Sequence, residues 1–174
     1  MPQANRLTLP SAPAKVQVAR RELWNDGRSA GSADFFTIGY TGRKADELLD
    51  TLVAHGVRTL IDIRQNAVSM YRPELSKSNL KALVESKGLH YYHMPDLGVP
   101  RDIRAKAIAA GNREVIWEWY DQYVVEPYLR SLHRFFNSAE HPVALMCVEI
   151  DPCECHRHRL FVGLEQRGLR GYDL

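Results

Sequence analysis

The residues best suited to chemistry in this 174-residue chain are concentrated in one segment, VALMCVEIDPCECHRHRL, from Val143 to Leu160. The segment contains all three cysteines of the chain and two of its seven histidines. A thiolate can act as a nucleophile or bind a metal, and histidine exchanges a proton near neutral pH. The apolar residues at the start predict a buried strand that leads into a polar loop and then a helix. In α/β proteins such a junction commonly binds ligands.

Cys147 ends the apolar run, and two roles are open to it. A free cysteine is often only a small buried hydrophobe. A nucleophilic cysteine requires cations or a helix N-terminus that stabilise its thiolate. Glu149 and Asp151 follow in the same loop, and their negative charges oppose both the formation of a thiolate and the binding of an anion. The sequence therefore leaves Cys147 as either a packing residue or a nucleophile.

Two further groups carry polar side chains that could meet a ligand. Cys155, His156 and Arg157 begin the predicted helix, where free backbone N–H groups favour anions. Asp62 and Arg64 end another predicted strand and point to the same side, so they can pair with each other or together hold a ligand. The candidate catalytic residues are therefore Cys147, Asp62, Glu149 and His156, and the candidate ligand-binding residues are Tyr40, Arg43, Arg64, Arg72, Cys155 and Arg157.

A zinc site is the alternative use of the same segment. Cys147, Cys153 and Cys155, with His156 or His158, supply enough ligands for tetrahedral coordination. Only one residue separates Cys153 from Cys155, however, and no second ligand pair has the spacing typical of structural zinc. We therefore predict neither a metal nor another cofactor, and a non-catalytic zinc-stabilised domain remains an alternative.

The predicted elements explain how these residues could meet. Short apolar runs near residues 35–39, 57–63, 89–94 and 142–147 predict strands, with helical patterns between them. This alternation predicts an α/β fold, a single domain with a mostly parallel sheet and helices on both faces. Residues 1–33 lack a sustained pattern and predict a flexible or draped N-terminal extension, so the domain should span 34–174. The loops after parallel strands meet at one edge of a sheet, which predicts that the candidate residues lie together.

The composition limits the classes of function. The chain is 45% hydrophobic and 25% charged, as in ordinary soluble proteins. It lacks an apolar run long enough to span a membrane and an N-terminal secretory signal, so we expect a cytoplasmic protein without membrane contact. The net charge of +2 is too small to argue for nucleic acid by itself.

Three functions remain compatible with the sequence, and the partner is otherwise unknown. The first is an enzyme acting on a small anionic or nucleotide-like substrate bound by the arginines. The second is a nucleic-acid-binding module that uses exposed arginines and tyrosines for phosphate contact and base stacking. Its candidate residues are Arg43, Arg72, Arg101, Arg104, Tyr40, Tyr71 and Tyr92. The third is the zinc-stabilised domain without catalysis.

Four motifs in order resemble one protein family. They are TIGYTGR (Thr37–Arg43), DIRxxAxS (Asp62–Ser69), MPDLG (Met94–Gly98) and MCVExDPxxCHR (Met146–Arg157). Together they resemble the DUF488 family, a domain of unknown function, over about residues 36–168. The resemblance implies a compact α/β domain and no established activity. A looser likeness to rhodanese lies in the strand-Asp-x-Arg and strand-Cys-loop-helix pattern, although the sixth residue after Cys147 is Cys153 rather than a basic residue.

Overall fold

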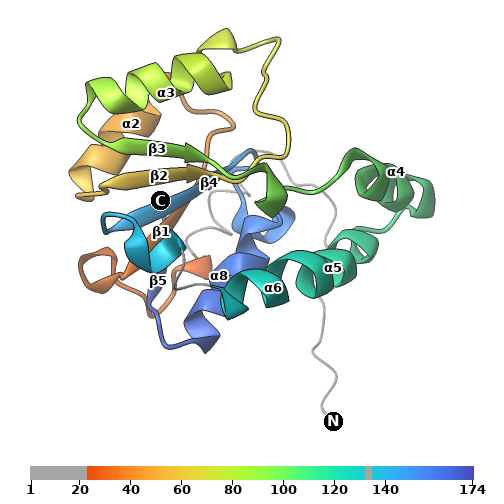
Figure 1. The fold of residues 1–174 in the computed structure, drawn as a ribbon. Coiled ribbons are helices and arrows are strands. Elements are labelled where there is room, and N and C mark those ends of the chain that lie inside the picture. The colour runs from red at the N-terminus through yellow and green to blue at the C-terminus, as the bar shows by residue number, and fades with distance from the viewer. Residues whose placement is uncertain (1–22, 132–134) are drawn as a thin grey trace.

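The computed structural model describes residues 23–131 and 135–174, and its centre is a five-stranded parallel sheet (Figure 1). The strands are β1 (Phe35–Gly39), β2 (Thr59–Asp62), β3 (His90–His93), β4 (Val143–Cys147) and β5 (Gly171–Asp173). Their order across the sheet is β3-β2-β4-β1-β5, and every pair is parallel. The predicted parallel α/β domain is confirmed, and the last short strand joins one edge of the sheet.

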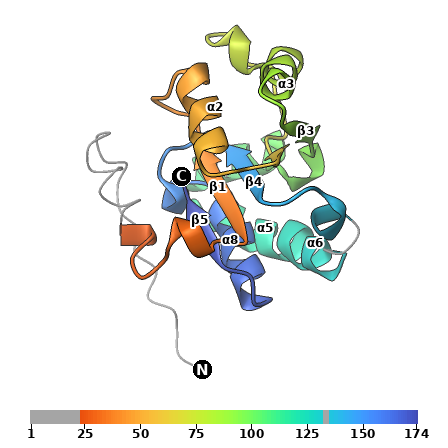
Figure 2. The same cartoon turned by 90° about the vertical axis from the view of Figure 1, so that its left-hand side faces the viewer.

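Helices cover both faces of the sheet (Figures 1 and 2). One face carries α2 (Ala45–Ala54) and α3 (Lys77–Ser86), and the other carries α5 (Glu114–Tyr120), α6 (Glu126–Arg130) and α8 (Arg157–Gln166). In Figure 1, α4 (Arg101–Ala110) lies beyond the carboxyl ends of β2 and β3. A π-helical turn, Asp121–Val125, links α5 to α6. No helix in the described ranges is long and apolar enough to cross a membrane.

Strand alternation divides the apolar core into two clusters, one on each face. In β4, Val143, Leu145 and Cys147 face α5 and α8, whereas Ala144 and Met146 face α2 and α3. This separation follows from the two-residue period of a strand, because successive side chains point to opposite faces. The face toward which a strand's last residue points therefore decides which helices surround it.

The helix after the cysteine loop begins later than the sequence pattern indicates. We expected it from about Cys155, but a short 3-10 turn at Pro152–Glu154 comes first and α8 begins at Arg157. The turn forms because the Asp151 carboxylate accepts a hydrogen bond from the Cys153 N–H at 2.9 Å, which is the usual role of Asp at a turn. Cys155 and His156 therefore lie in the connection before the helix.

The described part of the predicted extension packs against the domain. Trp24 makes an edge contact with Phe161, with ring centroids 5.2 Å apart. The Asn25 side chain exchanges hydrogen bonds with the backbone of Asp173 at 2.7 and 3.0 Å. The rest of the predicted extension, residues 1–22, lies outside the described residues.

Candidate functional site

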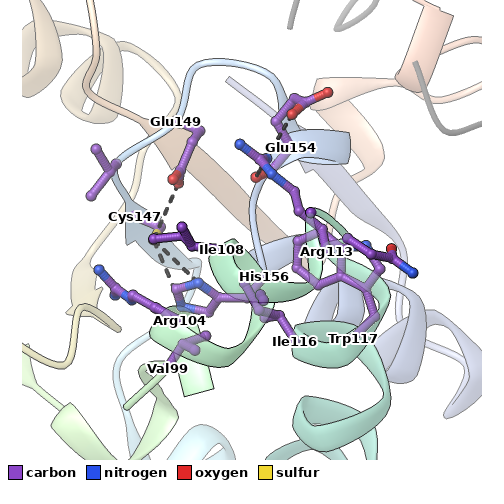
Figure 3. A pocket seen from close by; sticks show the side chains of 14 residues that line it. Val99, Arg104, Ile108, Arg113, Ile116, Trp117, Cys147, Glu149, Glu154 and His156 are labelled. Carbon is purple, nitrogen blue, oxygen red and sulfur yellow. Dashed lines mark hydrogen bonds and ion pairs between the residues drawn. The ribbon is translucent and has the colours of Figure 1, made fainter. Parts of the chain in front are cut away.

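A pocket of about 400 Å³ opens at the carboxyl end of β4, between the loop that follows this strand and the helices α4 and α5 (Figure 3). Its walls combine apolar side chains with an unusual number of ionisable ones. This combination is typical of sites that bind and transform small molecules. The lining residues are Val99, Arg104, Ala107, Ile108, Gly111, Asn112, Arg113, Ile116, Trp117, Cys147, Val148, Glu149, Glu154 and His156.

Cys147 is the centre of the polar part of this pocket. Its Sγ lies 3.8 Å from Nδ1 and 3.7 Å from Nε2 of His156, and 3.9 Å from a carboxylate oxygen of Glu149. Three of the four predicted catalytic residues therefore meet in one place, as the dashed lines of Figure 3 show. Because the sulfur is almost equally distant from both ring nitrogens, it lies on the axis of neither lone pair. The Cys147 sulfur therefore interacts with the charge of the whole His156 ring rather than with one of its nitrogens.

The electrostatics of this group favour a thiolate beside an imidazolium. Burial is the largest effect on Cys147 and opposes its ionisation, but hydrogen bonding from Cys155 and the charge of His156 outweigh it, so the pKa of Cys147 is lowered. Burial likewise opposes the charge on His156, yet the attraction of the Cys147 sulfur raises the pKa of this imidazole. Glu149 acts in the direction that we expected and opposes the thiolate. Its effect is smaller than that of the two favourable neighbours.

Asp151, the other carboxylate expected to disfavour the thiolate, does not line the pocket. It is fully buried and holds the turn before α8. Of the two carboxylates expected to oppose the thiolate, only Glu149 therefore lines the pocket, which weakens the objection to a thiolate at Cys147. Glu154, from the same connection, also lines the pocket, but its carboxylate pairs with Arg113.

Arg157 holds the loop that carries Glu149. The guanidinium is fully buried and pairs with Asp173, with Nε 3.1 Å from Oδ1. It also donates to the carbonyls of Glu149 and Ile150, the latter at 2.9 Å. A predicted ligand-binding residue is thus engaged in a buried ion pair and in loop contacts, and it does not line the pocket.

The same loop passes very close to the end of β1. A Cβ atom added at Gly39 would lie 1.8 Å from the Glu149 carbonyl oxygen, so only glycine allows this approach. Gly39 belongs to the TIGYTGR motif, and its place in the structure explains a requirement for glycine there. The strand end, the loop and Arg157 together fix the backbone around Cys147.

Asp62 and Arg64 lie on the opposite face of the sheet. Asp62 is in register with Met146, so its side chain points toward α3 while Cys147 points toward α5 and α8. The predicted pairing is present, because Arg64 Nη2 lies 2.6 Å from Oδ2 of Asp62. The Tyr91 hydroxyl donates to the same oxygen at 2.7 Å. Both members of the pair are almost fully buried, and neither lines the pocket.

The remaining predicted ligand-binding residues also lie away from the pocket. The ring of Tyr40 is covered by Arg64, whose guanidinium carbon is 5.3 Å from the ring centroid, and by Arg72 at 5.9 Å. Arg72 pairs with Glu74 at 3.0 Å. Arg43 donates to the carbonyl of Leu174 at 2.6 Å. Arg43 and Arg72, which were also candidates for nucleic-acid contact, do not line the pocket.

The sequence analysis missed most of the wall opposite Cys147. Arg113, at the start of α5, forms an ion pair of 2.6 Å with Glu154 across the rim of the pocket. Trp117 and Ile116 supply the apolar wall. Arg104 is exposed and lines the pocket, and its guanidinium makes no hydrogen bond or ion pair with any residue that the structure describes. The sequence named Arg104 only as a candidate for nucleic-acid contact. The signal for a place in this pocket was its position in the loop and helix after β3, at the carboxyl edge of the sheet.

A metal ion is the other species that this centre could hold. Donor atoms of Cys147, Cys155 and His156 lie within 4.8 Å of one another, and all three residues are buried. Sulfur and imidazole ligands suit zinc. These are three ligands, one fewer than a tetrahedral site requires. Cys153 is exposed, and Nδ1 of His158 contacts the Cys155 carbonyl at 2.5 Å, so these two predicted alternative ligands lie outside the group.

Comparison with known proteins identifies the family but no activity. Searches of curated proteins and of solved structures found no match, so the likeness to rhodanese remains a prediction. The model of the family described as "Domain of unknown function DUF488" matches residues 44–161. This span includes Cys147, Glu149, His156 and the helices that wall the pocket. Since it covers well over half of the chain, the protein belongs to the DUF488 family.

Proposed function

We propose that this protein is an enzyme that acts on a small organic anion, with Cys147 as its nucleophile. The observation that carries this proposal is the position of Cys147 on the pocket wall, with its sulfur 3.7 Å from His156. A cysteine is activated as a nucleophile when a neighbouring cation lowers its pKa. The lowered pKa of Cys147 and the raised pKa of His156 both favour this charged pair.

The other pocket residues have complementary roles in the proposed reaction. Arg104 supplies an exposed cation that binds the anionic group of the substrate. Ile116 and Trp117 pack against its apolar part. After the sulfur attacks, His156 donates a proton to the departing group, because its ring is the nearest acid to Cys147. Glu149 repels a second negative charge and so restricts the anionic group to the Arg104 side of the pocket.

Alkylation rates test this proposal directly. Cys153 is exposed and would react as well, so the experiment uses the C153S variant as its parent. Iodoacetate is a small organic anion, and iodoacetamide is its neutral counterpart. We expect Cys147 to be modified faster by iodoacetate than by iodoacetamide, the reverse of ordinary thiols, as measured by peptide mass spectrometry.

Substitution at Arg104 separates anion binding from simple thiol reactivity. R104A should slow the reaction with iodoacetate several-fold and leave the reaction with iodoacetamide unchanged. R101A is the matched control, because Arg101 is an exposed arginine of the same helix that does not line the pocket. Equal rates for the two reagents in the parent, or no modification of Cys147, would count against the proposed function.

A further inference from the structure

A second buried thiol lies directly behind the proposed nucleophile. Cys155 is 1% exposed, and its sulfur belongs to the same group of donor atoms within 4.8 Å as Cys147 and His156. Cys147 is equally buried, at 1% exposed, but it lines the pocket, whereas Cys155 does not. A substrate can therefore reach Cys147 first, and Cys155 can meet only what Cys147 has already bound.

This order of access limits the kind of adduct in which Cys155 could take part. A thiol attacks a sulfur atom that carries a good leaving group, as in a mixed disulfide or a sulfenic acid. It does not displace the carbon of a stable thioether. A second thiol behind the nucleophile therefore has a chemical use when the substrate delivers sulfur or oxygen to Cys147.

We propose that Cys155 is the resolving cysteine of this site, and that the substrate is a small anionic disulfide or hydroperoxide. The two substrates share one chemistry, a two-electron oxidation of the Cys147–Cys155 pair. The inference rests on the proposed function, because it requires Cys147 to attack first. Cys155 acts on the covalent adduct and so takes part in the reaction itself.

The steps balance for a disulfide substrate. The Cys147 thiolate forms a bond to one substrate sulfur, the substrate S–S bond breaks, and the released thiolate takes the proton of His156. Cys155 then attacks the Cys147 sulfur and gives its proton to the neutral imidazole, which lies in the same cluster. The second substrate thiolate leaves and is protonated from His156. One disulfide has become two thiols, and the protein has become oxidised.

For a hydroperoxide, the Cys147 thiolate attacks the terminal oxygen and the O–O bond breaks. The released alkoxide takes the proton of His156 and leaves as an alcohol. The resulting sulfenic acid reacts with Cys155, which forms the same internal disulfide and releases water. In both cases an external dithiol returns the pair to its reduced form by two thiol–disulfide exchange steps. The reductant is thus a second substrate of the dithiol class.

The test uses dithionitrobenzoate, an anionic aryl disulfide that releases a coloured thiolate at each exchange step. C153S is the parent, because it removes the exposed thiol. We expect about two coloured thiolates per chain from C153S, and an intact mass lower by two hydrogens without an adduct. C153S/C155S should release about one and retain the mixed disulfide at Cys147. C153S/C155A, checked by circular dichroism, serves where the serine at position 155 disturbs folding.

A parallel measurement with a hydroperoxide distinguishes the two substrate types. C153S should form the internal disulfide, whereas C153S/C155S should accumulate a sulfenic acid that dimedone traps. The faster of the two reactions in C153S identifies the preferred oxidant, and either one supports the inference.

Three results would overturn it, and they are distinguishable. A single coloured thiolate from C153S with a persistent adduct excludes resolution by Cys155 but leaves Cys147 as a nucleophile. No release from C153S, before or after treatment with a chelator, contradicts the proposed function as well. Release only after the chelator removes a stoichiometric metal shows that Cys147, Cys155 and His156 are ligands, and it replaces both proposals.

Discussion

The buried ion pair between Arg157 and Asp173 should be a major source of stability for the loop beside Cys147, and D173N tests this. Both side chains are fully buried. The Asp173 carboxylate accepts from Arg157 at 3.1 Å and from the Thr37 hydroxyl at 2.6 Å. Asparagine keeps the shape of the side chain but leaves the guanidinium charge without a counter-charge. Removing one partner of a buried pair typically costs about 3–5 kcal/mol.

Urea unfolding followed by tryptophan fluorescence measures this cost. With a slope of about 2 kcal/mol per molar urea, the midpoint of D173N should fall by about 1.5–2.5 M. The matched control is D50N, which makes the same exchange in the exposed pair of Asp50 and Lys87. Exposed pairs contribute about 0.2–1 kcal/mol, so its midpoint should move by at most about 0.5 M.

The comparison of D173N with D50N can refute the reasoning. Similar midpoints for the two variants would show that Arg157 finds compensation elsewhere, for example from the carbonyls of Glu149 and Ile150. If D173N does not fold, the variant R157M/D173L remains informative. Replacing both charges with apolar groups should recover much of the lost stability. Failure of this double variant to fold would locate the requirement in the loop contacts rather than in the pairing of charge.

Three further predictions concern single residues around the site. H156Q, in the C153S parent, should raise the pH midpoint of Cys147 alkylation by about 1–3 units, because a cation that lowers the pKa of the thiol has been removed; an unchanged profile would exclude the charged pair. G39A should destabilise the protein by about 1–3 kcal/mol in urea, because its Cβ would overlap the Glu149 carbonyl; a neutral result would mean that the loop moves freely. Burial lowers the pKa of His158 to about 4, from about 6.5 for an exposed histidine, so the unfolded chain binds the proton more readily and the free energy of unfolding should fall between pH 6.5 and 4. By pH 5 the loss in the free energy of unfolding is about 2 kcal/mol. In urea unfolding at several pH values, H158Q should show a free energy of unfolding that falls less steeply between pH 6.5 and 4. The same pH dependence in H158Q and the parent would contradict this prediction.

The sequence predicted the elements of the fold well because the strands are short apolar runs. Buried parallel strands have no polar alternation, and helices with one apolar face separate them here. Cys147, Glu149 and His156 could be predicted to meet because one short loop carries all three. The start of α8 could not be predicted as well, because Cys155, which follows the Asp151 turn, has an extended backbone and the helix begins only at Arg157.

The expected contribution of Asp62 and Arg64 shows what the sequence alone leaves undetermined. Alternation correctly indicates that the two side chains share one side of β2, and it predicts their pairing. It does not indicate which side of the sheet this is relative to Cys147. That depends on the register between β2 and β4, where Asp62 lies opposite Met146. A shift of one residue would bring Asp62 to the face of Cys147. The sequence also could not predict the ion pair of Arg113 and Glu154, because the two residues are 41 positions apart and meet only in the folded chain.

The two faces of the sheet also differ in how completely their polar groups are satisfied. On the α3 face, Asp62 accepts from Arg64 and Tyr91 at 2.6–2.8 Å, with every partner well aligned and buried. Such a network stabilises the end of a strand and leaves nothing for a ligand. On the α5 face, the Cys147 sulfur lies 3.7–3.9 Å from His156 and Glu149 and adjoins a pocket. A buried thiol with such loose partners on the wall of a pocket can form a bond to a bound ligand at little cost. This difference, more than the number of polar residues, supports the proposal that Cys147 is the reactive centre and that Asp62 and Arg64 belong to the framework.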